Sequence, residues 1–251
     1  MSMITLLRCI AATLLMASFA SVQAATITWE FARDLNNGSE QGSGYDNSYV
    51  FDSAGQSLGV TAWADMNTGT FQAANVTWFD EGLGVCNEGE GKNLAKCTSR
   101  ANDRQTDNRG GGQQDWLLMT LPSDALQGSI IINPQGNSDR DVTYWVGTIT
   151  DPYLLKNQSY SDLGGLGFGE QINVANSNGS DPITISLADL QGNAILFGAE
   201  LGGSNDAFMI NALSATFDPA GPSAAVPAPS AVYLFASGLG LLGFVRRRIA
   251  A

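Results

Sequence analysis

The sequence contains no histidine, and this absence removes several kinds of catalytic machinery. The Ser-His-Asp and Cys-His arrangements need an imidazole to move a proton, so this chain can build neither of them. Metal sites with histidine ligands are excluded for the same reason. Glycoside hydrolysis needs only two carboxyl groups and stays open as an alternative. The candidates for such a pair are Asp80, Glu81, Asp115 and Glu170.

No spacing among these four acids places two of them across a cleft. Acidic residues that flank glycine and other turn formers are ordinarily solvated parts of turns. We therefore interpret the four as turn residues, and we predict that the chain is not an enzyme.

Basic residues are also scarce. The 251-residue chain has 12 Lys and Arg against 24 Asp and Glu, and its net charge at pH 7 is -12. Removal of both terminal segments would leave eight basic residues against 24 acidic ones, a net charge of -16. Such a chain repels phosphate backbones, so we expect no nucleic-acid partner. The charge suits a soluble protein and leaves divalent-cation binding open.

Cysteine is limited to three residues. Cys9 lies in the apolar leader, whereas Cys86 and Cys97 flank ten polar-rich residues in the body of the chain. Exported chains meet oxidising conditions, so we predict a disulfide between Cys86 and Cys97. Closing so short a loop stabilises by about 2–3 kcal/mol. Without histidine, this pair alone cannot complete a four-ligand zinc site.

Long amphipathic helices and internal repeats are missing as well, whereas strand signals and turn formers are frequent. Apolar and polar residues alternate with a period of two, which is typical of half-buried strands. About ten strands without helical crossovers predict one all-β domain over residues 25–220, an antiparallel, jelly-roll-like β-sandwich. An up-and-down barrel is the alternative. The expected strands cover residues 27–31, 58–62, 71–79, 116–121, 128–132, 142–149, 183–187, 194–199 and 213–217.

Two long loops are predicted, over residues 80–115 and 153–178. Binding residues usually lie on loops that a rigid sheet holds in place. Calcium takes six to eight oxygen ligands, and Asp103 and Asp107 are the leading candidates in the first loop. No EF-hand or nonapeptide repeat is present, and Asx residues are also good turn formers, so solvated turns are the competing interpretation. The residues of suitable type are Asn102, Asp103, Asp107, Asn108, Asp139 and Asp141.

The tryptophans offer a second kind of binding surface. Exposed rings in a row would stack against sugars. Each tryptophan falls within a strand pattern, however, and we expect them in the core rather than on a platform. The five residues are Trp29, Trp63, Trp78, Trp116 and Trp145.

The N-terminus has the three parts of a signal peptide. Arg8 gives a positive charge, and an apolar run from Cys9 to Phe19 follows it. Val22 and Ala24 place small residues where a signal peptidase reads them, so we predict residues 1–24 as the signal peptide, with cleavage before Ala25. The apolar run is too short to span about 30 Å of hydrocarbon.

The C-terminus also has three parts. A linker rich in Pro, Ala and Ser begins near residue 221 and includes Val226, Pro227, Ala228 and Pro229. A mostly apolar, uncharged span over residues 230–245 predicts a transmembrane helix, and its glycines let another helix approach closely. The basic cluster Arg246, Arg247 and Arg248 follows, and the positive-inside rule keeps it in the cytoplasm.

Within this segment of residues 221–251, the part from Val226 to Arg248 resembles the PEP-CTERM sorting signal of Gram-negative bacteria. The resemblance implies that an exosortase, a membrane-embedded cysteine transpeptidase, cleaves near the proline motif and passes the protein to the cell surface or matrix. One departure is that Ala228 occupies the place of the family's glutamate. An ordinary C-terminal anchor is the alternative interpretation.

The body carries a second, shorter likeness. Gly82-Leu83-Gly84-Val85 precedes a polar loop, and Asp115 then leads an apolar strand. This order resembles a group of exosortase-dependent surface proteins with a β-rich body and no established catalytic role. The likeness implies a surface or matrix role.

These features predict an exported protein whose precursor is anchored in the inner membrane and whose mature form is on the cell surface or outside the cell. Its expected partners are signal peptidase and exosortase. We expect a non-catalytic structural or adhesive role in the envelope or biofilm, with no required cofactor. The alternatives are a module that binds exopolysaccharide with calcium-supported loops, and a secreted hydrolase that uses two carboxylates.

Overall fold

Antiparallel strands make up most of the described chain. The computed structural model describes residues 24–31, 45–91, 105–108, 113–136, 138–176, 179–187 and 190–217. Every pair of named strands is antiparallel, which confirms the prediction of an all-β protein. The described residues belong to one unit that runs from Ala24 to Asp218.

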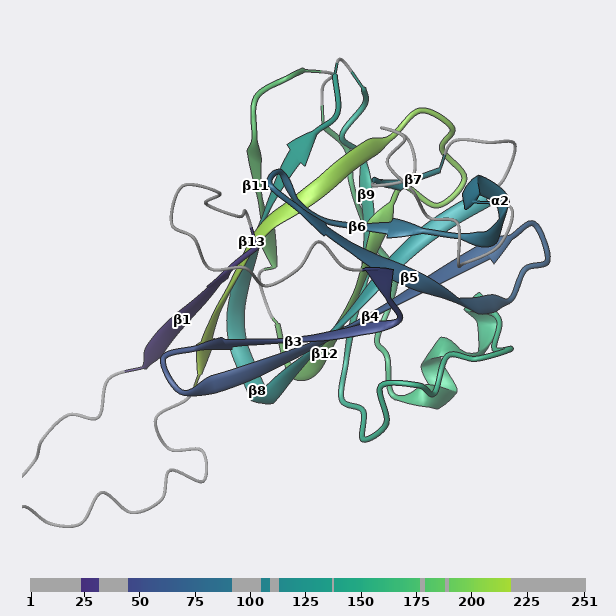
Figure 1. Cartoon of the computed structure of the whole chain (residues 1–251). Helices are drawn as coiled ribbons and strands as arrows, with labels where there is room; N and C mark the ends of the chain where they lie inside the picture. The colour runs from purple at the N-terminus through teal and green to yellow at the C-terminus, as the bar shows by residue number, and fades with distance from the viewer. Residues whose placement is uncertain are drawn as a thin grey trace, which may run out of the picture. The chain divides into compact units, whose positions relative to one another are not determined.

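Figure 1 shows the elements in their order along the chain. They are β1 (Ala25–Glu30), β2 (Tyr45–Asp46), β3 (Ser48–Ser53), β4 (Gln56–Met66), β5 (Phe71–Phe79), β6 (Gly82–Cys86), α2 (Glu88–Gly91), β7 (Thr106–Asp107), β8 (Gln113–Pro134), β9 (Val142–Gly147), η4 (Tyr160–Leu166), β10 (Ile172–Val174), β11 (Ile183–Leu187), β12 (Gly192–Ala199) and β13 (Ala207–Phe217).

Helices are short throughout the described residues. The two named helices are α2, with 4 residues, and the 3-10 helix η4, with 7 residues. Neither is long and apolar enough to cross a membrane. The predicted span at 230–245 lies outside the described part, as do the rest of the sorting tail and the signal peptide up to residue 23.

The 22-residue strand β8 organises the sheet by changing its partners halfway along. Residues 113–120 of β8 pair with β4, and residues 116–120 pair with β12 on the other side. Residues 125–134 lie against β13, and β11 flanks them on the other side. The change falls at the exposed residues 122–124, where Pro122 has no N–H to donate to a ladder. The sequence predicted two strands here, whereas the structure has one.

Five strands form a closed circuit of hydrogen-bonded neighbours. β8 pairs with β4, β4 with β5, and β5 with β6. The pairing of Leu83 in β6 with Ile210 in β13 joins this run to β13, which pairs with β8 again. β1 extends β13 on one side, and β9 and β10 extend β12 on the other.

Side-chain alternation along β8 divides the interior into two hydrophobic clusters. Leu117 and Met119 point into a larger cluster with Phe197 and Phe208. Trp116 belongs to a second cluster on the opposite face of the same strands. Because both faces are covered, the run from Trp116 to Leu121 is almost continuously apolar instead of alternating.

The second cluster is covered by residues 149–168, a segment that includes η4. Leu155 and Leu163 from this segment are buried against the sheet. Hydrogen bonds to the sheet hold it: the Phe71 N–H donates to the Gln158 carbonyl at 2.8 Å, and the Ile149 N–H donates to the Asn193 side-chain Oδ1 at 2.9 Å. The sequence predicted a loop over residues 153–178, and the structure has turns and η4 over most of it, with β10 as the one strand among its described residues. The sequence did not indicate that this loop covers a core.

Several strand predictions match the structure closely, including 71–79 and 183–187. The first long loop was wrongly predicted over residues 82–86, because this segment is β6. Its alternate glycines have no side chains to give a period-two signal, so the pattern read as a turn. β3 was also missed.

Candidate functional site

Buried polar side chains gather where several strand ends meet. β7 pairs with the start of β13, and the end of β12 pairs with the start of β9. A parallel bridge between Asp139 and Asp206 joins the segment before β9 to the start of β13. The buried polar residues of this region are Asn87, Gln105, Thr106, Asp107, Asn108, Gln114, Asp115, Ser138, Arg140, Thr143 and Asp206.

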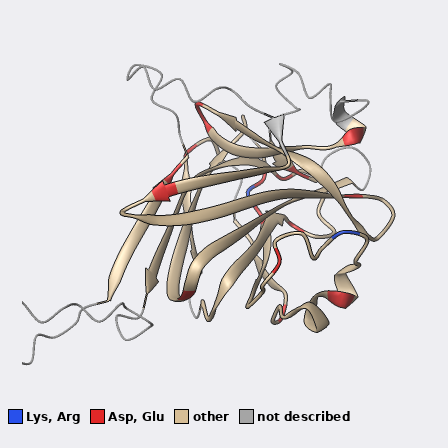
Figure 2. Cartoon of the chain, turned by 60° about the horizontal axis from the view of Figure 1, so that its bottom comes forward, with Lys and Arg blue, Asp and Glu red and all other residues tan. Residues whose placement is uncertain are grey.

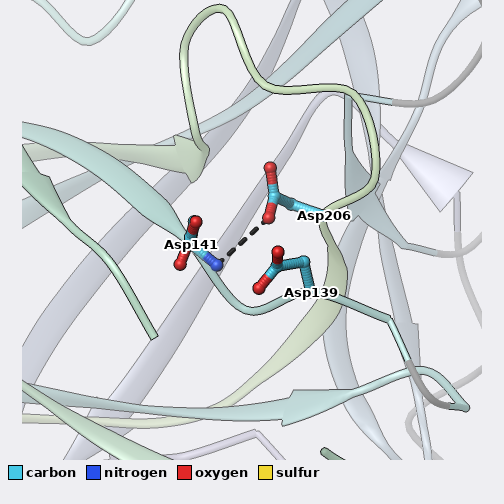
Figure 3. A group of neighbouring side chains, drawn as sticks. All are labelled: Asp139, Asp141 and Asp206. Atoms are coloured by element: carbon cyan, nitrogen blue, oxygen red, sulfur yellow. Dashed lines mark hydrogen bonds between the residues drawn. The ribbon is translucent and has the colours of Figure 1, made fainter. Parts of the chain in front are cut away.

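Three carboxylates form the centre of this region. Oxygen atoms of Asp139, Asp141 and Asp206 all lie within 4.8 Å of one another. Figure 3 shows Asp206 approaching from the start of β13, with the other two on the segment that leads into β9. Asp206 is 2% exposed, whereas Asp139 and Asp141 are half-buried.

Both carboxylate oxygens of Asp206 accept hydrogen bonds. Asn108 Nδ2 donates to one oxygen, and the Asp141 N–H donates to the other at 3.1 Å. Asn108 Oδ1 in turn accepts the Asp206 N–H at 2.9 Å. The Asn108 side chain therefore binds both the backbone and the carboxylate of Asp206 and fixes β7 against β13.

The other two carboxylates also accept main-chain hydrogen bonds. Asp139 Oδ1 accepts the N–H of Arg140 at 2.9 Å, and Asp141 Oδ1 accepts the N–H of Asn176. Asn176 Nδ2 donates to the Arg140 carbonyl at 3.0 Å. The cluster thus joins segments from four distant parts of the sequence.

The surroundings of Asp206 raise the pKa of its carboxyl group. Its burial raises the pKa to about 6, hydrogen bonds from Asn108 and Asp141 oppose the rise, and the neighbouring carboxylates of Asp141 and Asp139 add to it. Figure 2 shows that basic residues are few among the described positions. Two bases, Arg140 and Lys156, are described, and the Arg140 guanidinium donates to the Asp181 carbonyl at 3.0 Å.

The donor set suits a hard cation such as Ca²⁺, which takes carboxylate and carbonyl oxygens. Of the predicted ligands, the structure brings together Asn108, Asp139 and Asp141. Asp103 and Asn102 lie outside the described residues. Asp107 is buried, and its N–H faces Asp115 Oδ2 at 3.4 Å. Calcium binding stays a prediction.

Asp206 is the member of the cluster that the sequence did not indicate. It follows the glycine-containing turn at residues 201–205 and directly precedes β13. Because Asp206 lies far along the chain from Asp139, no short sequence motif contains both residues. An acid that directly precedes an apolar strand, directly after a turn, was the one local signal.

The four acids considered for hydrolysis occupy dissimilar places. Asp80 and Glu81 are exposed in the turn between β5 and β6, and Glu170 is exposed after the segment that covers the second core. Asp115 is fully buried in β8 and accepts a hydrogen bond from Asn87 Nδ2 at 3.0 Å. The three carboxylates that lie together, Asp139, Asp141 and Asp206, are therefore none of these four.

The tryptophans lie in the core instead of forming a platform. Trp29, Trp63, Trp116 and Trp145 are each at most 4% exposed. Trp78 is partly buried against the first cluster, and its Nε1 donates to the Phe31 carbonyl at 2.7 Å. The interpretation as core residues is confirmed.

Two further sets of predicted residues stand apart from this site. Cys86 is buried at the end of β6, whereas Cys97 lies outside the described residues, so their bridge stays a prediction. Of the residues around the predicted signal cleavage, Ala24 and Ala25 are exposed at the start of β1. The sorting residues 226–229 and 246–248 lie outside the described part.

Comparisons with known proteins give no relative. No family model matches the chain, and neither a curated protein nor a solved structure matches it. The function is therefore argued from the residues and the structure.

Replacing Asp206 with Asn should change how stability depends on pH. The folded-state pKa of about 6 lies above the ordinary value of 3.8, so the folded protein holds this proton more tightly. The group therefore contributes stability at low pH that is lost as pH rises through 6. We expect the free energy of unfolding of the wild type, relative to Asp206→Asn, to fall by about 1–2 kcal/mol between pH 4 and 7.

Urea unfolding at a series of pH values measures this difference. Asp80→Asn, which removes an exposed carboxylate in a turn, is the matched control. The same pH slope for the wild type and Asp206→Asn would contradict the assignment of the raised pKa.

Proposed function

We propose that this chain is an exported, non-catalytic protein of the bacterial cell surface or extracellular matrix, sorted by an exosortase. The observation that carries the proposal is the order of parts at residues 226–248: a proline motif, an apolar span and three arginines. An apolar span followed by a basic cluster holds a chain in the inner membrane, where a membrane-embedded transpeptidase can reach the proline motif.

The described body supports a structural or adhesive role. Its antiparallel sheet has an apolar cluster on each face of β8, which makes a rigid scaffold for the loops. Its buried carboxylates accept hydrogen bonds that join strand ends, as expected of groups that hold a fold together. The acidic composition keeps such a protein dispersed outside the cell.

We further propose that the sheet is arranged as a jelly-roll-like sandwich whose two layers join at one edge, where Leu83 in β6 pairs with Ile210 in β13. The exchange of partners along β8 supports this arrangement, because a strand that changes neighbours halfway can contribute to two layers. The two apolar clusters would then be the space between the layers and the space under residues 149–168.

Intact mass of the protein recovered from its host tests the sorting proposal. In the native strain we expect a mature species that starts at Ala25 and ends near Pro227, because both terminal segments are removed. In a strain without exosortase, that species should be lost. Replacing Arg246, Arg247 and Arg248 with Ala gives a control that keeps the proline motif and should also remain unprocessed. A C-terminus that retains the three arginines in both strains would instead identify an ordinary anchor.

The alternative functions stay predictions. A carbohydrate-binding role is favoured by one specific feature, the open groove described below. A two-carboxylate hydrolase has less support, since the four acids first considered are dispersed or buried.

A further inference from the structure

An open groove lies on the outer face of β3 and β4. It is beside residues 149–168, the segment that covers the second hydrophobic cluster. It has a volume of about 320 Å³ and reaches from β3 across β4 to Thr120 in β8. Pro152 and Tyr153 form its wall on the side of the covering segment. We refer to it as the β4 groove.

The groove exists because its floor has no side chain at the centre. Gly59 in β4 pairs with Val50 on one side and with Thr120 on the other. A Cβ placed on Gly59 would meet nothing closer than the Thr120 Cβ, at 3.8 Å. The sheet surface is therefore bare between two flanking side chains, one of which, Val50, is 68% exposed.

The wall of the groove carries an aromatic ring. Tyr153 is 50% exposed, whereas Leu155, two residues later, is buried in the second core. Thr61 Oγ1 in β4 faces the Pro152 carbonyl at 3.4 Å, which places the start of the covering segment against the sheet. A half-exposed tyrosine on a fixed segment gives a flat apolar face beside the groove.

The polar groups of the groove are uncharged. Hydroxyl groups come from Ser48, Ser57, Thr61 and Thr120, and no acidic or basic residue lines it. Thr120 Oγ1 is buried below the surface of the groove. Thr61 is 3% exposed and its hydroxyl already donates to the Pro152 carbonyl, whereas Ser57 is exposed and Ser48 is half-buried. A hydroxyl can both donate and accept, so Ser48 and Ser57 suit a ligand that carries hydroxyls of its own.

We propose that the β4 groove binds neutral sugar units of a polysaccharide. Sugars present hydroxyls at the ring edge and an apolar C–H face, which match the Ser48 and Ser57 hydroxyls and the tyrosine wall. The net charge of -12 disfavours an anionic polymer. This inference rests on the proposed surface or matrix role, and it names the class of partner for that role.

Binding of short oligosaccharides to the mature protein recovered from its host tests the groove. The probes are cellohexaose and maltohexaose as neutral chains and hexagalacturonate as an anionic one, measured by calorimetry. At least one neutral probe should bind, and the anionic probe should not. Tyr153→Ala should weaken binding about tenfold or more, because stacking on the ring is lost. Gly59→Leu should abolish binding by filling the floor.

Matched controls separate binding from folding. Leu126→Ala removes an exposed apolar side chain outside the groove, and Gly164→Leu adds a side chain where a Cβ meets no atom within 4 Å. Both controls should bind as the wild type does. Thermal unfolding of Gly59→Leu checks that this variant remains folded.

Several results would overturn the inference. One is that neither neutral probe binds at millimolar concentration. Another is that Gly59→Leu binds a neutral probe as tightly as the wild type does. A third is that hexagalacturonate binds in the groove. A concentration-dependent dimer that Gly59→Leu abolishes would assign the groove to a second copy instead. The sorting proposal stands or falls separately, since intact mass tests it without these variants.

Discussion

Gly82→Ala is expected to destabilise the protein by at least about 3 kcal/mol and to leave much of it unfolded. Gly82 has a φ of 126°, which an L side chain rarely adopts. A Cβ at this position would also lie 2.3 Å from the carbonyl oxygen of Ile210, so β6 would have to move away from β13. The affected place is the pairing of Leu83 with Ile210, which closes the circuit of five strands.

Urea unfolding monitored by tryptophan fluorescence measures this loss. Gly59→Ala is the matched control, since it makes the same chemical change in a strand where the new Cβ has only ordinary contacts. We expect the control to alter the free energy of unfolding by less than about 1 kcal/mol. Equal stabilities for the two variants would show that the close approach of β6 to β13 is unimportant.

Trp116→Ala is expected to cost about 3–5 kcal/mol and to loosen the segment that covers the second core. Trp116 is fully buried, and its ring lies 5.2 Å from Trp145 and 5.8 Å from Tyr160. Its Nε1 donates to Tyr160 Oη at 3.0 Å. Truncation removes these contacts together, and it leaves η4 without its aromatic partner on β8.

Limited trypsin digestion reports where the loss occurs. Lys156 is exposed in the covering segment, and we expect faster cleavage after it in Trp116→Ala, detected by mass. Trp116→Phe keeps a ring but removes the N–H donor, so it should cost about 1–2 kcal/mol. Cleavage after Lys156 at the wild-type rate, despite a large loss of global stability, would mean that residues 149–168 are held by their edges alone.

The structure adds a physical role to two glycine-rich stretches of the sequence. Gly82-Leu83-Gly84-Val85 suggested a likeness to certain surface proteins, and the structure adds that Gly82 permits the contact between β6 and β13. The second glycine-rich stretch was predicted as a long loop, and the structure adds that it buries Leu155 and Leu163 over the tryptophans.

The candidate site was only partly accessible from the sequence. Asp139 and Asp141 lie two residues apart and drew attention as carboxylates of suitable type for calcium. Asp206 and Asn108 join them only because β13 pairs with β7 and β12 pairs with β9. No local pattern encodes a contact between residues that distant along the chain.

The sequence by itself determined the strand content, the acidic charge and the absence of histidine chemistry, because composition and period-two alternation are local properties. It also carries the export and sorting predictions, which depend on short linear segments. The tertiary structure decided the path of β8, the second core, the carboxylate cluster and the β4 groove. Each of these depends on which distant strands pair, and pairing is set by the burial of both faces of the sheet and by the close approach that Gly82 allows.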